Sequence, residues 1–125
     1  MDEKQVQQIA NDSIKDKISF LEAINRLRNI GVWGYRFDVN THTKIFFGQN
    51  DSFVERQNYN IRIKREFSKQ KVIDAIRTRQ MNKIDFDEFV RQIGDAGIFD
   101  YIVDIPGKKV IYRGLFESHE EKMPI

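Results

Sequence analysis

The chain has 125 residues, of which 40% are hydrophobic and 32% charged, and its formal net charge is +2. This length and composition are typical of one globular domain and exclude an intrinsically disordered chain, which needs fewer apolar residues and a larger charge imbalance. The chain has no cysteine, which excludes disulfides, thiolate metal sites and cysteine nucleophiles.

The first half of the chain is predicted to begin with two helices. Apolar residues near its start favour a helix over residues 4–14, and Phe20, Ile24 and Leu27 have the 3–4 spacing of a half-buried helix over 19–30. Ser19 and Glu22 match a capping box, although Glu22 and its counterpart Glu88 also form a pair of acids. Gly31 follows the last apolar turn, where a left-handed residue commonly ends a helix.

After Gly31 the apolar period changes to two. Trp33, Tyr35, Phe37 and Val39 alternate with more polar residues, which predicts a strand with one buried face. A turn at residues 40–42 leads to a second strand over 43–48, and a short third strand is predicted over 52–56. The first half is therefore read as helix–helix–strand–strand, with a possible third strand.

The second half repeats the first at an offset of 66 residues. Residues 5–55 align with 71–121 without a gap, and twelve of these 51 pairs are identical. We therefore expect helices over 70–80 and 85–96, and strands near 99–105, 109–114 and 118–122. Two copies are too few for a solenoid, so the repeat indicates one domain with a pseudo-two-fold axis.

The predicted fold class is α+β. An internal duplication of a helix–helix–strand–strand(–strand) unit would give an antiparallel sheet of four to six strands with helices packed on one face. Residues 1–125 form a single domain in this interpretation, with repeat unit A at 5–55, a basic connector at 56–70 and repeat unit B at 71–121.

Two pairs of identical residues are candidates for ligand binding at the junction of the units. Tyr35 and Tyr101 lie on the apolar strand face, where a phenol either packs at the edge of the core with a hydrogen-bond partner or forms a platform for a ligand. Asp38 and Asp104 point the other way, near a turn, and either cap turn amides or bind a ligand.

The basic connector is a candidate for nucleic-acid contact. It places Tyr59 and Phe67 among basic residues, a combination used to bind single-stranded nucleic acid. The candidate contacts are Arg62, Lys64, Arg65 and Lys69. In the alternative interpretation the connector is a solvent-exposed segment without a binding role. Apolar Ile61 and Ile63 alternate with the cations, as in a segment with one face in solvent.

Known motifs for catalysis, metals and cofactors are absent. The two histidines, His42 and His119, have no second ligand residue at metal spacing, and the chain has no glycine-rich phosphate loop or nucleophile elbow. We therefore name no catalytic residue, metal or cofactor and expect a non-catalytic protein. Residues 1–5 are too polar for a signal peptide, no apolar run approaches the ~20 residues of a membrane span, and we expect a cytoplasmic location without membrane contact.

The sequence resembles the YbcV-like family of bacterial and prophage proteins, some of which carry the label phage envelope protein. The resemblance rests on the stretches 17–20 and 83–89, on Gly31 and Gly97 with the following tyrosines, and on residues 46–48 and 111–114. It implies a prophage origin and offers no activity, cofactor or catalytic residue.

The leading functional hypothesis is a protein-interaction domain, because strands at 52–56 and 118–122 would leave sheet edges open for pairing with another protein or a second copy of the chain. The alternative is a small-molecule binding domain with its site at the junction of the two repeats. A second alternative is nucleic-acid binding through the basic connector.

Overall fold

Each of the four helices begins after a side chain that caps its first turn. The helices are α1 (Glu3–Ile14), α2 (Phe20–Asn29), α3 (Lys69–Gln80) and α4 (Phe86–Asp95). The capping side chains accept a hydrogen bond from the backbone N–H three residues further on, which satisfies an amide that has no partner inside the helix. These caps are Asp2, Ser19, Ser68 and Asp85.

Only one of the two hydrogen bonds of each predicted capping box is present. Ser19 and Asp85 accept from the amides of Glu22 and Glu88, as predicted. The two glutamate side chains, however, form ion pairs along their own helices, Glu22 with Arg26 and Glu88 with Arg91. The two glutamates therefore belong to the helix surfaces and are not brought together.

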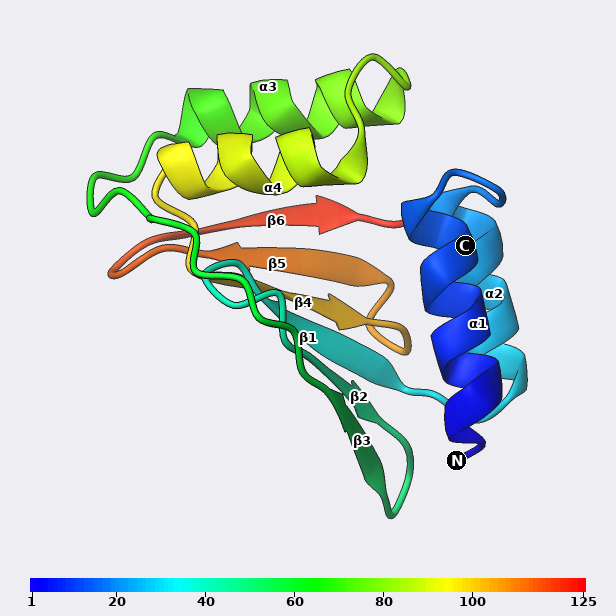
Figure 1. Ribbon diagram of the computed structural model, residues 1–125. Coiled ribbons are helices and arrows are strands. Elements are labelled where there is room, and N and C mark those ends of the chain that lie inside the picture. Colours follow the sequence, from blue (N-terminus) through cyan, green and yellow to red (C-terminus); the bar gives the residue numbers. More distant parts are fainter.

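A computed structural model describes all residues 1–125 and shows four helices on one face of a six-stranded antiparallel sheet (Figure 1). The strands are β1 (Gly34–Asp38), β2 (Lys44–Phe47), β3 (Ser52–Glu55), β4 (Asp100–Asp104), β5 (Lys109–Arg113) and β6 (Ser118–Lys122). Their order in the sheet is β3-β2-β1-β4-β5-β6. The α+β class and the repeated element order are therefore confirmed, and the third strand is present in both units.

The two units meet where β1 pairs with β4. In this antiparallel pair Arg36 lies opposite Ile102, and Gly34 lies opposite Asp104. Arg36 and Ile102 are also equivalent positions of the repeat, 66 residues apart. A pseudo-two-fold axis therefore passes through this pair and runs perpendicular to the sheet.

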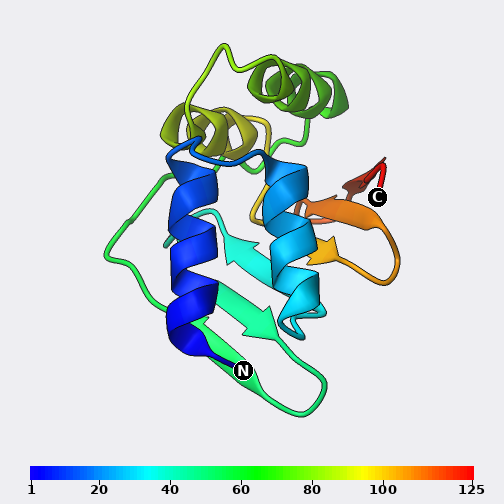
Figure 2. The same ribbon diagram turned by 90° about the vertical axis from the view of Figure 1, so that its right-hand side faces the viewer.

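Both helix pairs cover the same face of the sheet. Figure 2 shows α1 and α2 side by side in front of the strands, with α3 and α4 above them. Many strand residues on this face, among them Phe37, Phe46 and Val103, are almost completely buried and belong to a core cluster of 23 residues. None of the four helices is long and apolar enough to cross a lipid bilayer.

The opposite face of the sheet carries an ion cluster around Asp100, which is only 4% exposed. Arg113 donates to both carboxylate oxygens at 2.7 and 2.6 Å, and Arg36 donates to one at 2.7 Å. Burial alone would raise the pKa of Asp100, but the hydrogen bonds from Arg113 and Arg36 outweigh it and lower the pKa below its ordinary value of 3.8. The cluster joins β1, β4 and β5 across the junction of the units.

The glycines that end α2 and α4 have the predicted left-handed conformation, with φ of +87° at Gly31 and +90° at Gly97. Their surroundings differ. A Cβ atom at Gly31 would have no neighbour within 4 Å, whereas at Gly97 it would lie 2.5 Å from the backbone oxygen of Glu66. The basic connector therefore passes directly over the end of α4 and has no counterpart over α2.

This difference predicts unequal effects of the same substitution at equivalent positions. Gly31→Ala should destabilise the protein by about 1–2 kcal/mol, the strain of a left-handed alanine. Gly97→Ala should destabilise the protein by the same strain plus about 1–3 kcal/mol for displacing the connector. Urea unfolding of the two variants measures both values, and equal destabilisation would contradict the close contact at Gly97.

Asp100→Asn should destabilise the protein by about 1–3 kcal/mol at pH 7, because three hydrogen bonds from two arginines lose their charged acceptor. A carboxyl with a lowered pKa stabilises the folded state above its ordinary pKa of 3.8, and this contribution is lost as the pH falls through the folded-state pKa. The stability difference between wild type and variant should therefore be constant from about pH 5.5 to 8 and shrink below about pH 4. A difference that persists unchanged at pH 2–3 would show that Asp100 acts through packing alone.

Candidate functional site

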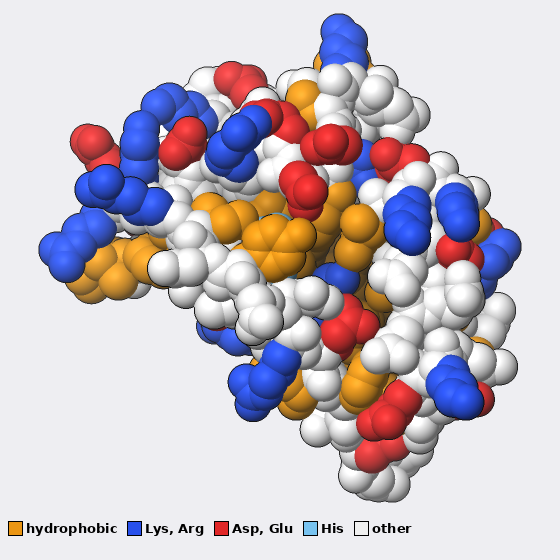
Figure 3. Space-filling view, viewed as in Figure 1, with side chains coloured by type: hydrophobic (Ala, Val, Ile, Leu, Met, Phe, Trp, Pro, Cys, Tyr) orange, Lys and Arg blue, Asp and Glu red, His pale blue; other side chains and the backbone are white.

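A cavity of about 390 Å³ lies between the two helix pairs and the sheet, and 15 of its 24 lining residues are hydrophobic. Figure 3 shows a hollow with a hydrophobic lining between α4 and α1, with acidic side chains along its upper rim. The walls come from the C-terminal ends of α1 and α3 and the N-terminal ends of α2 and α4. Strands β1, β2, β4 and β5 form its floor.

The cavity lies on the pseudo-two-fold axis. Nine pairs of its lining residues stand at equivalent positions of the two units. They are Ala10/Ile76, Ser13/Arg79, Ile14/Gln80, Asp16/Asn82, Phe20/Phe86, Ala23/Phe89, Tyr35/Tyr101, Lys44/Val110 and Phe46/Tyr112. The cavity is therefore formed by the duplication itself, since each half of the chain contributes the same wall positions.

Three tyrosines from three strands form the centre of the floor. The rings of Tyr35 and Tyr101 lie 6.5 Å apart between centroids, and Tyr112 lies 5.4 Å from Tyr101. Their hydroxyls make no hydrogen bond to a protein group, and burial raises the pKa of all three above 10. The phenols are therefore neutral at physiological pH and can donate a hydrogen bond into the cavity.

Lys44 brings a buried cation to the floor of the cavity. Its side chain is only 8% exposed, and its ammonium lies 3.6 Å from the Glu55 carboxylate and 6.0 Å from the ring centroids of Phe37 and Phe86. Burial lowers the pKa of Lys44, and Glu55 opposes this effect by stabilising the charged form. The distance to Glu55 exceeds that of a good hydrogen bond, so the ammonium retains free donors.

The two acidic residues that line the cavity already have partners. Asp16, in the loop after α1, pairs with Arg79 of α3 at 2.8 Å and thereby links the two helix pairs. Glu121 accepts from Arg77 and lies 2.8 Å from His119. Although burial raises the pKa of Glu121, the hydrogen bonds from Arg77 and His119 lower it overall. Both carboxylates are therefore engaged within the protein.

Of the four residues predicted to bind a ligand at the junction, the structure brings Tyr35 and Tyr101 to the cavity and leaves Asp38 and Asp104 outside it. The Asp38 carboxylate accepts from the Thr41 amide, and that of Asp104 accepts from the Gly107 amide. The aspartates thus cap the turns after β1 and β4. The hydrogen-bond partner that was expected for the phenols of Tyr35 and Tyr101 is absent, because no protein group bonds to their hydroxyls.

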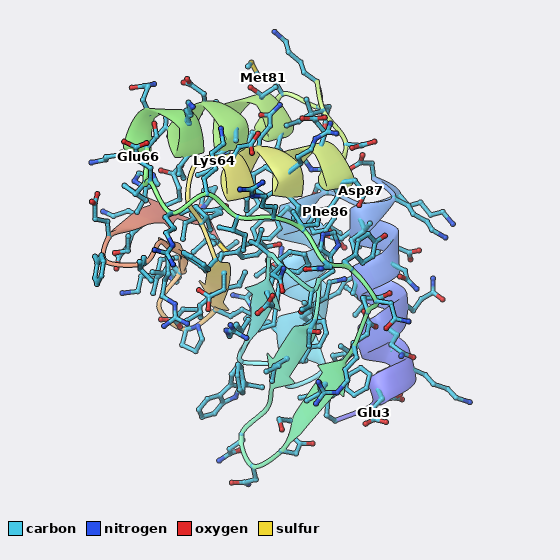
Figure 4. All side chains as sticks on the ribbon, turned by 60° about the vertical axis from the view of Figure 1, so that its left-hand side comes forward. Glu3, Lys64, Glu66, Met81, Phe86 and Asp87 are labelled. Atoms are coloured by element: carbon cyan, nitrogen blue, oxygen red, sulfur yellow. The ribbon has the colours of Figure 1, made fainter.

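The basic connector runs as an extended segment outside the sheet. It is held by hydrogen bonds from the Ile61 amide to the Asn40 oxygen and from the Lys64 amide to the Gly94 oxygen, so that Lys64 lies alongside α4 (Figure 4). Its isoleucines face the core and its basic side chains face solvent, as the alternating pattern predicts. Nucleic-acid contact by Arg62, Lys64, Arg65 and Lys69 remains a prediction.

His42 lies outside this cavity, at a second depression next to Asp85 and Asp87. Its ring stacks on that of Tyr59 at a centroid distance of 3.9 Å, and its Nε2 atom is buried without a hydrogen-bond partner. Burial lowers the pKa of His42, and the Asp87 charge partly opposes this. The stack fastens the connector to the turn between β1 and β2.

Sequence reasoning missed Lys44 and Tyr112. The repeat contained a signal for Lys44. Its equivalent position in unit B holds Val110, which is buried, so Lys44 lies on the inner face of its own strand. The residues that lie opposite Lys44 and Val110 on the neighbouring strands are both glutamates, Glu55 and Glu121.

Comparison with known proteins places the chain in a family. Residues 7–119, nearly the whole chain, match the model of a family described as protein of unknown function (DUF1398). No curated protein matches the sequence. The more specific YbcV-like assignment and a prophage origin remain predictions. A match of this extent shows that the chain belongs to the DUF1398 family.

Proposed function

We propose that this protein binds a small, largely apolar molecule in the cavity between its two repeat units. The observation that supports this most is the group of three tyrosines that line the cavity and whose hydroxyls have no hydrogen-bond partner in the protein. A volume of about 390 Å³ lies at the lower end of the ~300–1,000 Å³ of small-molecule sites. Such sites combine an apolar lining with a few convergent polar groups.

The placement of these tyrosines favours a binding role over packing alone. Their hydroxyls are accessible to solvent rather than sealed in the core, because Nε2 of His42 is the one buried side-chain polar atom without a hydrogen-bond partner. Phenylalanine would fill the same space without a polar group, and the position equivalent to Tyr112 does hold Phe46. A few polar groups that converge on an apolar pocket are the feature that orients a small ligand.

The hypothesis of a protein-interaction domain stays a prediction. Strands β3 and β6 are the sheet edges, as expected, but β3 has only four residues and β6 is rich in charge, features that protect edges from pairing. The uncovered sheet face carries a row of partly exposed apolar residues, Val54 and Ile45 on one side of Arg36 and Ile102 and Ile111 on the other. Association through that face would be independent of the cavity.

The binding proposal is tested by filling the cavity. Ala23 on α2 lines it and is equivalent to Phe89 on α4, so Ala23→Phe places in one wall the side chain already present in the other. The neutral fluorophore N-phenyl-1-naphthylamine should bind wild type, and the variant should bind at least about tenfold more weakly because apolar contact area is lost. Fluorescence titration measures both affinities.

Arg28→Phe, on the exposed side of the same helix, serves as the matched control and should bind the fluorophore like wild type. Ala10→Ile, which copies the equivalent Ile76, narrows the cavity by a smaller step and should give an intermediate affinity. Wild-type protein that leaves the fluorophore unbound, or equal binding by wild type and a folded Ala23→Phe variant, would refute the proposal.

A further inference from the structure

Each of the free polar groups on the floor of the cavity can donate a hydrogen bond. Three neutral phenols and the Lys44 ammonium face it, and the ammonium has one carboxylate neighbour, Glu55, at 3.6 Å. The two carboxylates that line it, Asp16 and Glu121, are paired with cations of the protein. A ligand that uses all four donors must bring acceptor oxygens, and a second cation would meet Lys44 while both carboxylates of the lining are already paired.

Lys44 breaks the symmetry of the cavity. Its equivalent in unit B is Val110, while the carboxylates opposite these two residues, Glu55 and Glu121, are identical. The floor of the cavity thus carries a cation on β2 and an apolar side chain at the equivalent position of β5. A ligand with one anionic group would be held in a single orientation, although the surrounding walls are nearly symmetric.

The sheet register sets the space beside Lys44. Lys44 lies opposite Phe37, and Phe37 lies opposite Tyr101, so Lys44 and Tyr101 stand two strands apart. Two strand spacings amount to about 10 Å. The walls along this distance include Phe20 and Phe86. This arrangement accommodates a short apolar body that carries one polar group at its Lys44 end.

We propose that the ligand is a compact apolar carboxylic acid, bound as the anion with its carboxylate on the Lys44 ammonium and its apolar body between Phe20, Phe86 and the tyrosines. A carboxylate accepts hydrogen bonds only, which matches the free donors of the cavity. The inference rests on the proposed function, because it specifies the ligand of the same cavity.

Matched probes test the carboxylate directly. Two acid–alcohol pairs of similar shape, 2-naphthoate with 2-naphthylmethanol and octanoate with 1-octanol, are titrated by calorimetry or ligand-observed NMR. Wild type should bind the better acid at least about tenfold more tightly than its alcohol, the worth of a hydrogen bond to a charged group. Lys44→Met, which keeps an apolar stem, should reduce this preference to within about twofold and leave the affinity for the alcohol unchanged.

Two further variants guard against a folding defect. Lys44→Met/Glu55→Gln removes both charges, so that no carboxylate is left buried alone, and should show the same loss of preference. Lys122→Met removes an exposed cation that also borders the cavity and should retain the wild-type preference. Thermal unfolding establishes that each variant is folded.

The possible outcomes separate the two proposals. Alcohols that bind wild type as tightly as the acids, or a preference that survives in folded Lys44→Met/Glu55→Gln, would overturn the carboxylate inference and leave the binding function intact. If neither the four probes nor N-phenyl-1-naphthylamine binds wild type, both proposals are overturned. Loss of acid preference in both Lys44 variants, with Lys122→Met unchanged, is the supporting result.

Discussion

The pairing of β1 with β4 is the contact on which the rest of the molecule depends, because it turns two three-stranded units into one sheet. The strands approach closely at Gly34, where a Cβ atom would lie 2.3 Å from the backbone oxygen of Val103. A three-stranded unit alone would expose apolar surface that the other unit covers in the complete sheet. Joining the units at this register places the equivalent residues Arg36 and Ile102 opposite each other and thereby defines the symmetry axis.

The cavity follows from that axis. A duplicated unit with two helices on one sheet face leaves a gap where the two helix pairs face each other, and the same wall positions border it from both sides. The pair of Asp16 with Arg79 bridges this gap, but both groups reach solvent and such pairs contribute about 0–1 kcal/mol. The space is therefore bordered by a weak contact, whereas the ion cluster around Asp100 holds the sheet beneath it.

Divergence of the two units gave the symmetric space its polarity. The exchange of Lys44 for Val110 and of Phe46 for Tyr112 changes the chemistry of the floor while the backbone positions remain equivalent. The connector adds a further asymmetry, because it crosses the end of α4 at Gly97 and is stacked on His42 through Tyr59. These differences distinguish two halves that otherwise pack alike.

The sequence by itself determined the local elements and their duplication. The 3–4 and two-residue periods predicted every helix and strand to within about two residues, because burial of one face is a local property of each segment. The repeat also indicated that Tyr35 and Tyr101 face a common junction. The capping of turn amides by Asp38 and Asp104 was one of the two roles predicted for these residues. The neighbours of the two tyrosines in space were not predictable with the same reasoning, and the role of Lys44 was missed.

Only the tertiary structure decided the order of the strands and the content of the cavity. Strand order depends on which edges pair across the connector, and no local pattern distinguishes the β1–β4 junction from other antiparallel pairings. A lysine in a strand and a tyrosine on an apolar face look the same in sequence whether their polar atoms have partners or not. The surroundings of Tyr112 and Lys44 in the cavity come from both units, and Lys44 meets Phe86 of the other unit only when the two units close around the axis.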